Sequence, residues 1–262
     1  MSWETLNLST DDRGVATLML DRAEKHNAMS AAMIGELSEA AHQLGADEDV
    51  RAVVLTGAGE SFCAGGDLGW MRAQFDADRA DRIAEAGRLA AMLGALNTMP
   101  KPLIGRINGQ AFGGGVGLMA VCDVAVAADH AMFGLTETRL GLIPATISPY
   151  VLARMGEGKA RRVFMSARRF DAAEAVRLDL IASAVSGEEL DAAVEAEVRP
   201  YLSAAPGAVA EAKALARALG PRIDEDVIAM SVERLADAWE GEEAREGIAA
   251  FFDRRKPVWS PK

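Results

Sequence analysis

The chain has 262 residues, of which 50% are hydrophobic and 26% are charged. This composition is typical of a globular protein with a sizeable core, in one large domain or two modest ones, and it excludes a disordered chain. The formal net charge of −11 argues against nucleic acid or an anionic membrane as a partner.

Strand and helix patterns alternate in the first third of the chain. An apolar run predicts a strand at 15–20, and Ser30 is the expected cap of a helix with apolar residues at three- and four-residue steps. A second strand is expected at 50–56. It ends in a glycine-rich loop, 57–68, where Asp67 is the natural N-cap of the next helix.

The alternation continues through the middle of the chain. An amphipathic helix is stopped before Pro100, and strands are expected at 103–107 and 124–127. Between these two strands, the glycines 113–115 lead into an apolar segment of helical length. Alternating strands and helices indicate an α/β architecture.

The last part of the chain reads as helical, and Asp171 opens it with the pattern of a capping box. We expect a core domain at 1–200 and a helical region at 201–262. The helices that the pattern predicts cover 188–204, 206–219, 223–239 and 242–255.

Both glycine-rich loops run from a strand into a helix. Free N–H groups and the positive end of the helix dipole at such a point form a site for an anion or an oxyanion. Neither loop contains the spacing of a dinucleotide-binding or P-loop motif. An ordinary tight turn between strand and helix stays open as the alternative.

Five segments together resemble the enoyl-CoA hydratase/isomerase (crotonase) superfamily. They are 61–68 (SFCAGGDL), 108–115 (NGQAFGGG), 133–144 (FGLTETRLGLIP), the N-terminal 21–28 (DRAEKHNA) and the C-terminal 251–257 (FFDRRKP). The resemblance covers nearly the whole chain. It implies a spiral of ββα units with a C-terminal α-helical trimerisation region, in a homotrimer or a hexamer built as a dimer of trimers.

The resemblance also assigns the catalytic residues. It implies that the backbone amides of Gly66 and Gly114 bind the thioester oxygen of an acyl-CoA, with Glu137 as the acid/base. This agrees with the chemistry, because an enolate that forms on the thioester oxygen is stabilised by two fixed amides. The substrate itself carries the coenzyme A, and no separate cofactor or metal is implied.

Further residues are implied to contact coenzyme A. The main chain of Ala28 and Ala64 would line the adenine pocket, and Lys25 would lie near the phosphates. Phe251 and Lys256 would reach the coenzyme A of a neighbouring subunit, although both lysines also fit solvated surface charges. The loop residues that the resemblance adds to the coenzyme A site are Gly65, Asp67 and Leu68.

One position departs from the pattern of hydratases with two catalytic carboxylates. These carry a glutamate two residues after the three glycines, where this chain has Gly117. A single carboxylate suffices for an isomerase that moves a double bond, so isomerisation stays open. The segment 142–152 resembles bacterial methylglutaconyl-CoA hydratases, some of which also have this glycine. We therefore expect an enoyl-CoA hydratase, with a Δ3,Δ2-enoyl-CoA isomerase as the alternative.

Other interpretations of these residues remain. Glu137 also fits a surface glutamate paired with Arg139, and an enzyme fold can be reused for binding RNA. The three histidines are scattered, which argues against a metal site. Cys63 and Cys122 indicate reduced thiols, and the first residues lack a secretory signal. We therefore expect a cytoplasmic protein with no membrane partner.

Overall fold

A computed structural model describes residues 3–261. The strands are β1 Leu6–Thr10, β2 Val15–Leu20, β3 Ala52–Gly57, β4 Ser61–Cys63, β5 Leu103–Ile107, β6 Gln110–Phe112, β7 Val124–Ala128, β8 Met132–Gly134, β9 Phe170–Asp171 and β10 Ser183–Val185. The α-helices are α1 Ala31–Ala46, α2 Leu68–Asp76, α3 Arg79–Thr98, α4 Gly114–Val121, α5 Ser148–Phe164, α6 Ala172–Arg177, α7 Leu190–Ser203, α8 Pro206–Leu219, α9 Glu225–Glu240 and α10 Glu242–Phe252. The short 3₁₀ turns are η1 Ala23–Lys25 and η2 Glu137–Leu140.

Two sheets form the framework of the fold. The larger has the strand order β1-β2-β3-β5-β7-β10, and the smaller has the order β4-β6-β8-β9. Each of the consecutive pairs β3/β4, β5/β6 and β7/β8 gives one strand to each sheet before the chain enters a helical segment. This repeat of two strands and a helix confirms the expected α/β spiral of ββα units.

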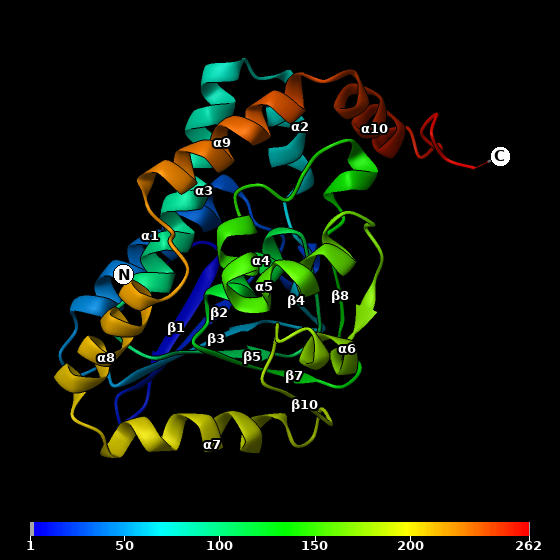
Figure 1. Ribbon diagram of the computed structural model, residues 1–262. Helices are drawn as coiled ribbons and strands as arrows, with labels where there is room; N and C mark the ends of the chain where they lie inside the picture. Colours follow the sequence, from blue (N-terminus) through cyan, green and yellow to red (C-terminus); the bar gives the residue numbers. More distant parts are fainter. Residues whose placement is uncertain (1–2, 262) are drawn as a thin grey trace.

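The two faces of the large sheet are covered by different layers (Figure 1). Helix α7 lies along one face, where Val194 and Val198 pack against Val54 and Ile104. The opposite face and the helices α1, α3, α4 and α5 share the main core. Since β3 and β5 are largely buried on both faces, their sequences are mostly apolar rather than alternating, and Arg106 is the charged exception in β5.

The patterns of long elements predicted the structure well. Strands at 15–20 and 103–107 and the helix at 206–219 have the expected bounds. Ser30 caps α1 by accepting a hydrogen bond from the Met33 amide at 3.2 Å, and Asp171 caps α6 through the Glu174 amide at 2.7 Å. The strand expected at 50–56 starts later, α7 and α10 are each three residues shorter than expected, and α9 starts two residues later and ends one residue later.

The C-terminal helices fold back over the other end of the molecule. Helix α9 packs along α3, where Val232 contacts Ala86 and Ala90. Helix α10 follows it and closes over the loop that carries η2, where Ile248 and Ala244 pack with Leu142 and Trp239. In Figure 1 these two helices (orange and dark red) lie above the green segment 134–147. This arrangement encloses a cavity.

Candidate active site

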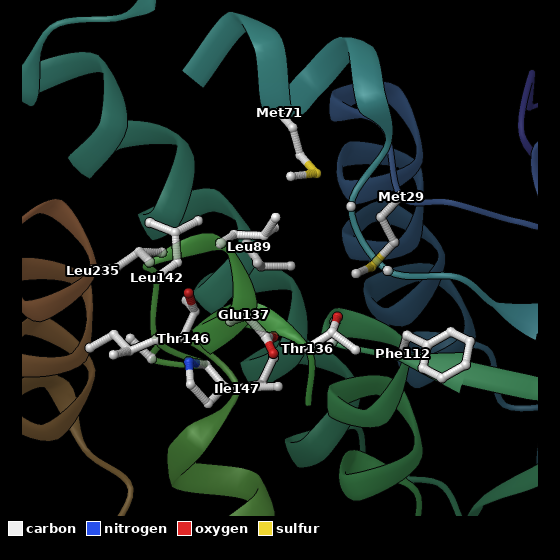
Figure 2. A pocket seen from close by; sticks show the side chains of 18 of the residues that line it. Met29, Met71, Leu89, Phe112, Thr136, Glu137, Leu142, Thr146, Ile147 and Leu235 are labelled. Carbon is white, nitrogen blue, oxygen red and sulfur yellow. The ribbon is translucent and has the colours of Figure 1, made fainter. Parts of the chain in front are cut away.

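The cavity lies between the two glycine-rich loops, the segment 134–147 and helices α3, α9 and α10 (Figure 2). Its volume is about 430 Å³. Most of its wall is apolar, formed in part by Leu89, Leu142, Leu235 and Trp239. A cavity of this size with few polar groups is typical of a site for a small organic ligand.

Gly66 offers a free backbone amide to the cavity. The chain at Met29 pairs with Gly66 in a parallel bridge, made by the Met29 amide to the Gly65 carbonyl at 2.7 Å and the Asp67 amide to the Met29 carbonyl at 2.9 Å. In such a bridge the N–H of the central residue points away from its partner. The Gly66 amide is therefore available to a ligand in the cavity, which this residue lines.

Gly114 offers the second amide. It is the first residue of α4, so its N–H precedes the first hydrogen bond within the helix. The preceding residue, Gly113, has a positive φ of 49°, a conformation that L side chains rarely adopt. The three glycines thus allow a sharp turn that presents the Gly114 amide to the cavity, at the positive end of the helix dipole.

The Glu137 carboxylate lies against this turn. A Cβ atom built on Gly113 would be 3.0 Å from Oε1 of Glu137, so a side chain at this position would crowd the carboxylate. Oε2 of Glu137 is buried and has no hydrogen-bond partner among residues 3–261. Burial raises the pKa of Glu137 to about 7, and the hydrogen bond from its own amide offsets only part of this effect.

A carboxyl group with a pKa near neutrality suits an acid/base catalyst. The interpretation of Glu137 as a surface glutamate paired with Arg139 is wrong, since Oε2 of Glu137 is buried and has no partner among the described residues. Helix α10 holds the turn that carries Glu137. A Cβ atom on Gly141 would lie 2.6 Å from the amide nitrogen of Ala244, so the two backbones touch.

The cavity brings together seven of the residues that the sequence singled out. Besides Glu137, Gly66 and Gly114, they are Ala64, Gly65, Leu68 and Phe251. Phe251 lies on the wall of this chain's own cavity. The side chain of Phe251 is 45% exposed there, so it borders both the cavity and solvent.

The other four candidate residues lie outside the cavity wall. Asp67 caps α2 through the amides of Gly69 and Trp70 and pairs with Arg22 at 3.1 Å. Burial acts to raise the pKa of Asp67, but these hydrogen bonds outweigh it and hold the pKa below its usual range. These contacts give Asp67 a structural role. The Ala28 carbonyl accepts a hydrogen bond from Arg22 at 2.7 Å. The side chains of Lys25 and Lys256 are both exposed.

Several cavity residues were not anticipated. Leu235 and Trp239 come from α9, far from the motifs in sequence, and no local pattern marks them. Thr146 and Ile147 follow the third motif directly, and Arg169 precedes β9. The sequence around Thr146, Ile147 and Arg169 contains no motif that would indicate a ligand-binding position.

Two other kinds of site are absent from residues 3–261. No three His, Cys, Asp or Glu side chains come together there as metal ligands. In the same range, no helix is long and apolar enough to cross a membrane.

Comparison with known proteins identifies the family. The sequence profile described as enoyl-CoA hydratase/isomerase matches residues 10–262. The chain belongs to the enoyl-CoA hydratase/isomerase family. Among its relatives is the probable enoyl-CoA hydratase echA8 of Mycobacterium bovis, 34% identical over 267 residues that span 99% of each chain.

Solved structures of the enoyl-CoA hydratase/isomerase family have the same fold. An enoyl-CoA hydratase from Shewanella pealeana is 39% identical with a TM-score of 0.81, covering 98% of this chain and 97% of the other. A second, a putative enoyl-CoA hydratase from Mycobacterium avium paratuberculosis, is 32% identical with a TM-score of 0.86, covering 98% and 99%. The crotonase-like fold expected from the sequence is confirmed.

Proposed function

We propose that the protein is an enoyl-CoA hydratase, which adds water across the C2–C3 double bond of an acyl-CoA thioester. The observation that carries this proposal is the buried, unpartnered carboxylate of Glu137 beside the amide of Gly114. Coenzyme A enters as part of the substrate, and no other cofactor is needed for this reaction.

The proposed reaction uses Glu137 twice. Its carboxylate takes a proton from water while the water oxygen bonds to C3, and the π electrons of C2=C3 move into the thioester. The charge that develops on the thioester oxygen is stabilised by the amides of Gly66 and Gly114. Glu137 then gives its proton to C2, which restores the carboxylate. Since one group serves one face of the substrate, H and OH add to the same face.

The test compares the wild type with Glu137→Gln on crotonyl-CoA, by following the loss of enoyl-thioester absorbance. We expect a loss of turnover of at least about 10²-fold with binding of the acyl-CoA retained, because the amide cannot accept a proton. Glu48→Gln, on the exposed surface, is the matched control. Turnover near the wild-type rate in Glu137→Gln would show that the assignment is wrong.

A second candidate reaction is supported by Gly117. Without a second carboxylate, Glu137 alone can move a proton between C2 and C4, which converts a 3-enoyl-CoA into a 2-enoyl-CoA. Supplying crotonyl-CoA and a 3-enoyl-CoA in separate assays distinguishes the two reactions. A hydratase adds water to crotonyl-CoA. A pure isomerase leaves crotonyl-CoA unchanged and converts the 3-enoyl-CoA into the conjugated 2-enoyl thioester.

Two arginines bear on the choice of acyl group. Arg139 and Arg169 line the cavity, and neither is ion-paired with a carboxylate within the described chain. The Arg169 guanidinium lies 5.1 Å above the ring of Phe112. We include 3-methylglutaconyl-CoA in the proposal because the free carboxylate on its acyl chain could form an ion pair with one of these arginines.

The proposed assembly is a trimer, alone or paired into a hexamer, formed through the region 201–262. Helix α8 has no buried residue in the single chain, and its Leu215 and Leu219 are 60% and 80% exposed. Such apolar exposure is typical of a surface that a second copy covers. Light scattering on the purified protein measures the mass, and a monomer would contradict the proposal.

The proposed compartment is the cytoplasm. Cys63 and Cys122 are both free and buried, and burial raises the pKa of each thiol to about 12. Neither forms a disulfide with the other, which is consistent with a reducing environment. Fractionation of cells that make the protein tests the location.

A further inference from the structure

Ile147 occupies the space that a side chain on Gly117 would need. A Cβ atom on Gly117 would overlap the Cγ2 methyl of Ile147 and lie 3.0 Å from its Cβ. Leu93 of α3 borders the same spot at 3.8 Å. The position from which a second catalytic carboxylate would enter is therefore closed by apolar groups, and a glutamate there would need a rearrangement of the segment around Ile147.

The same segment brings a hydroxyl to the cavity. Thr146 directly precedes Ile147, lines the cavity and is only 3% exposed. Its Oγ1 has no hydrogen-bond partner among the residues that the structure describes. Figure 2 shows the side chains of Thr146 and Glu137 both reaching into the cavity, with Ile147 beneath them.

An unpartnered hydroxyl is costly at so buried a position. Valine has the same shape as threonine and would fill the site without leaving a polar group unpaired. A hydroxyl in this position is therefore explained by a partner that is not part of the chain. Because the same cavity also holds the Glu137 carboxylate, a water molecule of the reaction fits that partner.

We propose that Thr146 positions the attacking water for Glu137, in the role left vacant by the missing carboxylate at Gly117. This inference rests on the proposed hydratase function. Oγ1 of Thr146 accepts the O–H of the water that is not transferred, while Glu137 takes the other proton and the water oxygen bonds to C3. Thr146 neither gains nor loses a proton, so it is a positioning residue.

This role makes a prediction that a purely structural role does not. Removal of a C2 proton needs Glu137 and the oxyanion amides but no attacking water. Loss of the Thr146 hydroxyl should therefore slow the addition of water and spare proton exchange at C2. The exchange is measured by NMR with butyryl-CoA in D₂O, since this saturated thioester forms the enolate without adding water.

The experiment compares wild type, Thr146→Val and Thr146→Ser. We expect Thr146→Val to lower kcat for hydration of crotonyl-CoA by about 10-fold to 100-fold, with KM and C2 exchange within about 3-fold of wild type. Thr146→Ser retains the hydroxyl and should recover most of kcat.

Three results would overturn the proposal. They are hydration by Thr146→Val at the wild-type rate, a Thr146→Ser variant as slow as Thr146→Val, and an equal loss of hydration and exchange. These differ from a failure of the proposed function, in which the wild type exchanges C2 protons or isomerises a 3-enoyl-CoA but hydrates no enoyl-CoA. That last result would overturn the role of Thr146 as well.

Discussion

Gly247 of α10 packs directly against the main chain of Leu140, three residues after Glu137. A Cβ atom on Gly247 would overlap the Leu140 carbonyl and lie 2.8 Å from its Cα. The close approach is repeated where Gly141 meets Ala244. The turn that carries the carboxylate is thus held by a helix near the end of the chain, and its position depends on glycines in both segments.

Gly247→Ala should therefore reduce both stability and activity. The added methyl has no room and should cost about 1–3 kcal/mol of unfolding free energy, even though alanine favours a helix by about 1 kcal/mol over glycine. Displacement of η2 should lower kcat more than it raises KM. Urea unfolding and steady-state kinetics measure the two effects.

Gly87→Ala is the control for this substitution. Gly87 is also in a helix, α3, but a Cβ atom there would have nothing within 4 Å. We expect this variant to be as active as the wild type and more stable by about 0.5–1 kcal/mol. Similar behaviour of the two variants would show that α10 does not hold the turn.

The fold was predictable where a segment is long and its environment uniform. The buried strands β3, β5 and β7 are mostly apolar, and α1 has both an apolar stripe and a capping serine. The smaller sheet was missed because its strands have only two or three residues, too few for any periodicity. The edge strand β1 was missed as well, since only Leu6 in it is buried.

Helix α5 was missed for a different reason. Gly156 has a φ of 70° and breaks the helix inside its span, and Pro149 lies near its start.

In the site, the glycine loops and Glu137 were recognisable because their function depends on local backbone geometry. The contact between Gly117 and Ile147 was not, because it joins α4 to the residue that precedes α5 through packing that no local pattern encodes.

The oxyanion role of Gly114 can be tested by removing one N–H group. Proline is tolerated at the first position of a helix, so Gly114→Pro deletes the amide without breaking a helical hydrogen bond. Gly114→Ala is the matched control, since its Cβ meets the same flexible methyl of Met29 but its N–H remains. We expect kcat of the proline variant to be about 10²–10³-fold below that of the alanine variant. Equal rates in the two folded variants would exclude the amide from catalysis.

The pH dependence of activity should report the titration of Glu137. Its carboxylate form is the one that accepts a proton from water, and burial raises its pKa to about 7. We expect kcat/KM to rise with pH and to level off above this value, because a single group must be ionised. A bell-shaped profile would instead indicate a second titrating group. The measurement is the initial rate of hydration from pH 5 to pH 9 in buffers of constant ionic strength, within the range where the protein stays folded.

The same pKa shift predicts how pH affects stability. The native state keeps the proton of Glu137 up to about pH 7, whereas the unfolded chain loses it near the ordinary value of 4.5. The native state therefore binds more protons between these values, and the contribution of Glu137 to stability falls as pH rises. By pH 8 the loss approaches about 3 kcal/mol at most.

Glu137→Gln isolates this contribution. The variant should be more stable than the wild type at pH 8 and nearly equal to it at pH 4.5, when both are compared by urea unfolding. Glu48→Gln, which changes an exposed carboxylate, should show no such divergence. A constant difference between Glu137→Gln and wild type across this range would contradict the raised pKa.

Arg169→Met tests whether the cavity selects a substrate with a second carboxylate. Methionine keeps an unbranched side chain that can pack on Phe112 but removes the charge. If Arg169 binds the acyl carboxylate, KM for 3-methylglutaconyl-CoA should rise about 10-fold while KM for crotonyl-CoA stays unchanged. Arg161→Met, at an exposed position on α5, is the control for loss of one positive charge. An equal rise for both substrates would mean that Arg169 binds the phosphates of coenzyme A instead, and the carboxylate assignment would then be wrong.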